Sequence, residues 1–104
     1  MPVPLPSPSR DHPRARTDLP VGVELEGRLV PARARNLSMV GLWLDAHFEP
    51  PDLFGLRIPL PGLPREVVAT ARVERRERRG VAVSFADIDW DDLLLVARWL
   101  APRL

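Results

Sequence analysis

The sequence predicts an all-β domain, a small antiparallel barrel of six strands with one C-terminal α-helix packed on it. The first observation is the scatter of 13 prolines over 104 residues, which disfavours a helical bundle and suits short strands joined by turns. The second is the alternation of apolar and polar side chains in several segments, which is the period of a half-buried strand. The third is a change to helical spacing in residues 87–104.

The first nine residues differ in composition from the rest of the chain. They alternate Pro with small or apolar residues, a pattern typical of a mobile, polyproline-like arm. The chain has 45% hydrophobic residues, enough for one core. We therefore expect a flexible arm at residues 1–9 and one domain at residues 10–104.

Three segments carry the clearest strand pattern. Residues 21–27, 65–74 and 78–85 each alternate apolar and polar side chains, so each is expected to bury one face. The residues predicted to point inward are Val21, Val23, Leu25, Val67, Ala69, Ala71, Val73, Val81, Val83 and Phe85.

Turns and weaker strands connect these segments. Residues 75–80 are predicted to form a hairpin connection that ends in Gly80, a residue that can take a positive φ. The apolar run that begins at Gly41 reads as a buried strand. Residues 53–62 are a weaker strand, because Pro59 confines it to a sheet edge or a strand end.

The C-terminal helix has a clear start and end. Asp89 is the predicted N-cap, and Asp91 and Asp92 fall in the first turn, where the helix dipole favours carboxylates. Pro102 is the predicted terminator.

Apolar residues cover more than one face of this helix. One stripe is expected to pack on the sheet, and Leu95, Val96 and Trp99 extend the apolar surface towards a protein partner. The residues of the predicted buried stripe are Trp90, Leu93, Leu94 and Ala97.

The charge balance argues against a polymer of nucleic acid as the partner. All 15 cationic residues are Arg, but 14 acidic residues leave a net charge of +1. The most basic stretch, residues 72–80, is interrupted by Glu74 and Glu77 and contains no aromatic side chain. Any anion site is therefore expected to be local.

The side-chain inventory predicts neither an enzyme nor a metal or cofactor site. Cysteine is absent, which excludes disulfides and thiolate chemistry. His12 and His47 have no metal-ligating company, and no serine stands in a catalytic-triad context. The chain shows neither a secretory signal nor an apolar stretch of membrane-spanning length, so we expect a cytoplasmic protein without membrane insertion.

An arginine pair lies near the start of the chain, in the stretch RDHPR. Three residues separate Arg10 from Arg14, and Pro13 forbids a regular helix between them. Two guanidinium groups on an extended segment suit the wrapping of an anionic ligand. The alternative is a solvated tail.

A polar cluster, NLSMVG, precedes the strand that begins at Gly41. Asn36 and Ser38 either make turn hydrogen bonds or present polar groups to a ligand that Gly41 admits close to the backbone. Ala and Arg alternate over residues 32–35, which places Asn36 and Ser38 on the alanine face unless a β-bulge intervenes. Trp43 leaves two interpretations open, packing among leucines or flanking a ligand base.

Together, RDHPR, NLSMVG and the stretch GVAVSFADID before the acidic helix start resemble the PilZ domain family over residues 10–100. The order and spacing match the family signatures RxxxR and [D/N]xSxxG. The resemblance implies binding of the bacterial second messenger cyclic di-GMP. The residues that it implies as ligand contacts are Arg10, Arg14, Asn36, Ser38 and Gly41.

The function expected from this resemblance is that of a non-enzymatic receptor. Cyclic di-GMP would order the N-terminal arm against the barrel, and a downstream protein would read the new surface. The alternative is a PilZ-like interaction module that binds no nucleotide and acts through its apolar C-terminal helix. Association into a homodimer stays open at this point.

Overall fold

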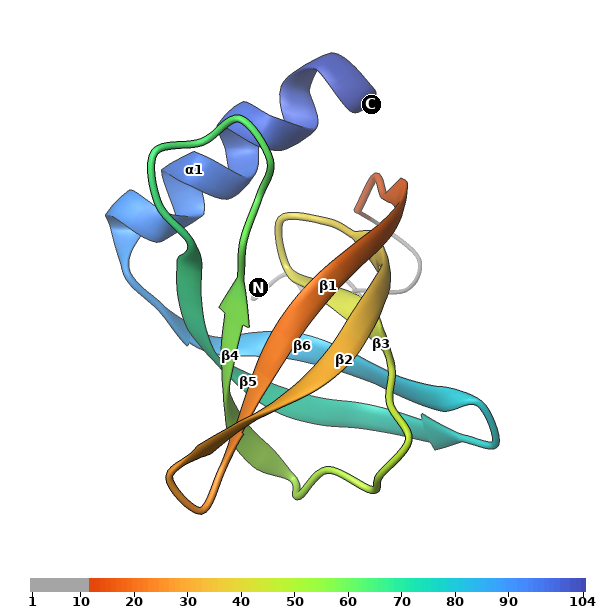
Figure 1. The fold of residues 1–104 in the computed structure, drawn as a ribbon. Helices are drawn as coiled ribbons and strands as arrows, with labels where there is room; N and C mark the ends of the chain where they lie inside the picture. Colours follow the sequence, from red (N-terminus) through yellow and green to blue (C-terminus); the bar gives the residue numbers. More distant parts are fainter. Residues whose placement is uncertain (1–11) are drawn as a thin grey trace, which may run out of the picture.

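Alternating side chains along six strands build a closed antiparallel barrel in the computed structural model, which describes residues 12–104 (Figure 1). Neighbouring strands follow the order β1-β2-β3-β6-β5-β4, and β1 pairs with β4 to close the barrel. The strands are β1 (Ala15–Leu25), β2 (Arg28–Leu37), β3 (Gly41–Asp45), β4 (Leu53–Ile58), β5 (Val67–Glu77) and β6 (Gly80–Ile88). The predicted fold class is confirmed, and the predicted arm at residues 1–9 lies outside the described residues.

The core fills the barrel with the residues that alternation selects. Seven of the ten predicted inward residues are buried, and Leu25, Val73 and Phe85 are half-buried and packed against the core. The seven are Val21, Val23, Val67, Ala69, Ala71, Val81 and Val83.

The β5–β6 hairpin is tighter than predicted. Its strands continue to Glu77 and from Gly80, so only Arg78 and Arg79 form the turn. Gly80 does not use the positive φ that a glycine can take, since among the described glycines only Gly27 and Gly62 have one. A Cβ on Gly80 would instead overlap the Leu44 carbonyl oxygen, so the glycine permits close approach of β3 and β6.

Pro59 marks the end of β4, as predicted. The strand stops at Ile58, so the missing N–H of Pro59 falls outside the ladder with β5. Because the barrel is closed, β4 has neighbours on both sides and is not an edge strand.

One helix and a short 3₁₀ turn end the chain. Helix α1 (Trp90–Leu100) begins after the predicted N-cap Asp89, whose side chain makes no capping hydrogen bond. Pro102 lies in the 3₁₀ turn η1 (Ala101–Arg103), so the predicted terminator is confirmed. Within residues 12–104, no helix has the length and apolar character needed to cross a membrane.

The predicted buried stripe of the helix is wrong. Trp90 is 70% exposed and Leu94 is 49% exposed, whereas Val96 is fully buried and Trp99 and Leu100 join the core. Leu95, also predicted to face a partner, packs against the core as well.

A contact from outside the helix accompanies this orientation of α1, in which Val96, Trp99 and Leu100 face the core. Arg65, in the connection between β4 and β5, forms an ion pair with the buried carboxylate of Asp92. Figure 1 shows this connection beside α1. Because residues at i and i+4 share a helix face, an inward Asp92 also turns Val96 and Leu100 inward.

Candidate functional site

The β2–β3 turn is closed by Ser38. Its backbone N–H donates to the Gly41 carbonyl oxygen at 2.9 Å, and its Oγ accepts the Val40 N–H at 3.2 Å. The hydroxyl also donates to the Gly41 carbonyl at 3.3 Å. Ser38 is 1% exposed. Turn chemistry therefore accounts for this serine, and its predicted contact with a ligand edge stays a prediction.

Gly41 is required by packing between strands. A Cβ at this position would overlap the Val83 carbonyl oxygen and lie 2.9 Å from the Ser84 Cα. Gly41 has no positive φ. Its absent side chain thus lets β3 approach β6, which is a reason for glycine that is independent of a ligand.

A β-bulge turns Asn36 to the outside of the barrel. The register of β2 against β3 shifts between Ala34 and Asn36, so Arg35 is the extra residue. Ala34 and Leu37 are fully buried, whereas Arg35 is exposed and Asn36 is half-buried. The bulge therefore moves Asn36 off the strand face that carries Ala32 and Ala34. The sequence alone left open on which face Asn36 lies.

The side chain of Asn36 also holds the neighbouring strand. Its Oδ1 accepts the backbone N–H of Trp43 at 3.0 Å, and the two residues are register partners. Within residues 12–104 the Nδ2 group of Asn36 makes no hydrogen bond, so both of its donors remain available.

Arg14 lies at the same end of the barrel. Ala15 pairs with Leu37, so Arg14 and Ser38 are the next residues beyond this pair in the two chain segments. The structure therefore brings Arg14 to the turn that carries the NLSMVG cluster. Arg10 lies outside the described residues.

Two arginines of β2, Arg33 and Arg35, form ion pairs with carboxylates. Asp18 Oδ1 accepts from Arg33 Nε at 2.5 Å and from Arg35 Nη1 at 2.7 Å. Arg35 Nη2 also contacts Asp45 Oδ2 at 3.0 Å. The hydrogen bond from Arg33, aided by the charges of both arginines, lowers the pKa of Asp18. This surface network is therefore internally neutralised.

Arg16 is a cation near the NLSMVG cluster, and it was not among the site residues predicted from the sequence. It is exposed and pairs in register with Asn36. Among residues 12–104 it makes neither an ion pair nor a hydrogen bond through its side chain. In the sequence, Arg16 could have been identified by its position two residues after Arg14, in the segment that forms the start of β1.

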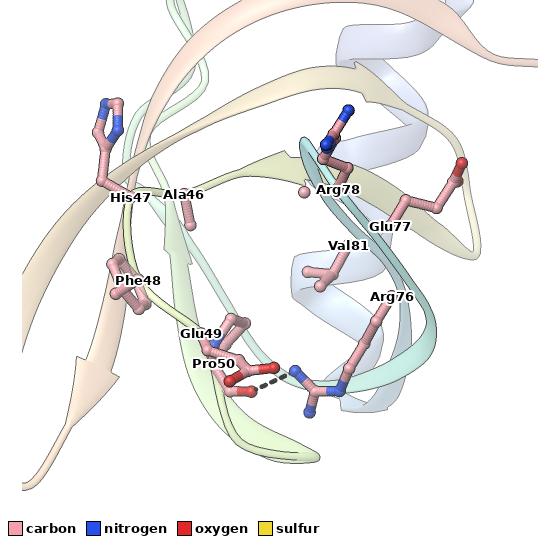
Figure 2. A pocket seen from close by; sticks show the side chains of 10 residues that line it. Ala46, His47, Phe48, Glu49, Pro50, Arg76, Glu77, Arg78 and Val81 are labelled. Carbon is pink, nitrogen blue, oxygen red and sulfur yellow. Dashed lines mark hydrogen bonds between the residues drawn. The ribbon is translucent and has the colours of Figure 1, made fainter.

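A cavity of about 360 Å³ lies elsewhere, between the β3–β4 connection and the β5–β6 hairpin (Figure 2). Arg76 ties the two segments together by donating to the Pro50 carbonyl at 2.8 Å and to Asp52 at 2.9 Å. Side chains of both charge signs line the cavity, among them Arg78 and Glu49. Of the predicted site residues that the structure describes, none lines it.

The fold and the site define a small β-barrel domain that presents polar and cationic groups at one end of its surface. The chain belongs to the PilZ domain family, whose model matches residues 8–101. PilZ domains are non-catalytic receptors that typically bind cyclic di-GMP.

A solved structure shares the fold. The Bacillus subtilis inhibitor of motility (MotI/DgrA) matches with a TM-score of 0.72 and 18% sequence identity. The match covers 90% of the present chain and 50% of the other, so this chain spans about half the length of that protein. No curated protein matches the sequence.

Proposed function

We propose that this chain is a cytoplasmic receptor for cyclic di-GMP and that Arg10, Arg14, Asn36, Ser38 and Gly41 form its site. Membership of a family of non-catalytic receptors supports the ligand class. The observation that carries the proposal is the bulge that turns Asn36 outward at the barrel end where Arg14 precedes β1.

The chemistry of the ligand suits these groups. Cyclic di-GMP carries two phosphates and two guanines, and each guanine offers O6 and N7 acceptors that match an arginine fork. Arg10 and Arg14 clamp phosphate and guanine edges, and the Nδ2 donors of Asn36 meet polar edges from the barrel side. Ser38 and Gly41 set the shape of the turn on which the ligand rests.

The signal is a change in the segment before β1. Ligand contacts to Arg10 and Arg14 fix this segment against the barrel, and their free energy offsets the entropy lost on ordering. A downstream protein then reads the combined surface.

Isothermal titration tests the receptor function. Charge-assisted hydrogen bonds contribute about 1.5 to 3 kcal/mol each, so Arg14→Ala is expected to weaken binding roughly 10- to 100-fold. Arg28→Ala is the matched control, because Arg28 is exposed at the other end of β2. Absence of binding by the unaltered protein at about 100 μM, near −5.5 kcal/mol, would reject the receptor function.

The interaction-module alternative loses the residues that motivated it. Val96 and Trp99 are core residues that a partner cannot reach without displacing the helix, and Leu95 is half-buried and packs against the core. Light scattering with and without cyclic di-GMP separates the two functions. Association that ignores the nucleotide would favour the module.

A further inference from the structure

Three side chains form a row across the outside of the barrel. Asn36 pairs in register with Arg16 on β1 and with Trp43 on β3. Neighbouring strands are about 4.8 Å apart, so the row spans about 10 Å. That length is comparable to one nucleotide, and the row begins beside the predicted site.

Trp43 lies outside the core although leucines flank it. Leu42 and Leu44 belong to the core cluster, whereas Trp43 neither joins it nor packs against it. Since successive side chains of a strand point to opposite faces, Trp43 points outward. Trp43 therefore does not pack with the leucines inside the barrel.

The indole of Trp43 rests on small residues of β6. Its Nε1 lies 3.1 Å from the position that a Cβ on Gly80 would take. Ala82, the register partner of Trp43, is outside the core cluster yet only 9% exposed, as expected if the indole covers it. Trp43 itself is half-buried, so part of the ring faces solvent.

The cation of the row differs from its neighbours. Arg33 and Arg35 are held by Asp18, whereas Arg16 makes no ion pair within residues 12–104. A guanidinium without a carboxylate partner has its whole fork available for an incoming acceptor.

We propose that this row is a guanine subsite: Trp43 stacks on one base of the ligand, and Arg16 donates to the O6 and N7 edge of that base. The inference rests on the proposed function and deepens it by assigning two residues outside the family signatures. Adenine presents a donor, N6, where guanine presents O6, so the fork of Arg16 favours guanine. The row thus adds specificity for cyclic di-GMP over cyclic di-AMP.

Titration of variants with both cyclic dinucleotides tests the subsite. Base–aromatic stacking predicts that Trp43→Ala weakens cyclic di-GMP binding roughly 5- to 100-fold, while Trp43→Phe retains most of the affinity. Arg16→Ala is expected to weaken binding at least about 10-fold and to reduce the preference over cyclic di-AMP. Arg28→Ala is the charge-matched control and is expected to bind as the unaltered protein does.

Fluorescence reports stacking directly. A ligand-dependent change in tryptophan emission is expected in the unaltered protein and in Trp90→Phe, whose exposed ring lies on α1, but not in Trp43→Phe. Circular dichroism confirms that each variant is folded.

The outcomes separate the two proposals. If the unaltered protein binds and Arg14→Ala binds more weakly, but Trp43→Ala and Arg16→Ala bind as the unaltered protein does, the subsite is overturned and the receptor function stands. If the unaltered protein binds no cyclic di-GMP, the receptor function falls and the subsite falls with it.

Discussion

Replacing Asn36 separates its role in the barrel from its role at the surface. Its Oδ1 accepts the Trp43 N–H at 3.0 Å, where the bulge interrupts the regular ladder between β2 and β3. Asn36→Asp keeps an oxygen at this place, whereas Asn36→Ala removes it. The family signature admits Asp or Asn at this position, and an acceptor oxygen is what the two side chains share.

The expected magnitudes follow from this one hydrogen bond. An intramolecular hydrogen bond contributes about 0.5–1.5 kcal/mol net, and an unsatisfied buried donor costs about 1–3 kcal/mol. Because Asn36 and Trp43 are only half-buried, we expect Asn36→Ala to lose about 1–1.5 kcal/mol. For a domain of this size that corresponds to a fall in Tm of roughly 4–10 °C. Asn36→Asp is expected to stay within about 0.5 kcal/mol of the unaltered protein.

Urea unfolding followed by circular dichroism measures both variants. The midpoint is expected to fall for Asn36→Ala at an unchanged slope, because the surface exposed on unfolding stays the same. The explanation is refuted if Asn36→Ala unfolds at the original midpoint, or if Asn36→Asp is destabilised equally.

Three further changes test the packing and the charges. Val96→Ala removes fully buried atoms and is expected to cost about 2–3 kcal/mol in urea unfolding, whereas Leu94→Ala, at a half-exposed side chain, is expected to cost less than about 1 kcal/mol; equal losses would contradict the assigned helix face. Gly41→Ala forces a Cβ into backbone and is expected to cost at least about 1–3 kcal/mol, so an unchanged midpoint would contradict the close approach. The lowered pKa of Asp18, caused mainly by Arg33, stabilises the fold above about pH 4, and this contribution is lost as pH falls through the lower folded-state value. Unfolding free energies measured from pH 6 to 2 should fall less steeply for Asp18→Asn, and parallel curves would speak against the pair.

Local pattern predicted the strands because the period of a strand is a local property. The alternation in residues 65–74 alone identifies the buried face of β5. The buried face of the helix could not be predicted in this way, because apolar residues occur on most sides of residues 90–100. Its orientation is linked to the contact between Asp92 and Arg65, 27 positions apart, which no helical period reveals.

The candidate site was also predictable only in part, because some of its features follow from local sequence and others from pairing between strands. The motifs located the polar turn, but the outward direction of Asn36 depends on a bulge that arises from pairing with β3. Gly41 and Gly80 illustrate a second limit, because a glycine in a sequence is compatible with a positive φ or with close backbone approach. In both cases a carbonyl on the neighbouring strand, at Val83 or Leu44, decides for close approach.

The pairing of arginines explains how a chain of net charge +1 offers a local anion site. Ion pairs with carboxylates engage the guanidinium groups of Arg33, Arg35, Arg57, Arg65, Arg75 and Arg76. Within residues 12–104, those that form no ion pair include Arg16, Arg28, Arg72, Arg78, Arg79 and Arg98. Of this second group, only Arg16 is in register with Asn36, and Arg14 precedes it by two residues. The availability of an arginine fork is therefore set by tertiary pairing, and near the NLSMVG turn that pairing leaves Arg16 in register with the outward amide of Asn36.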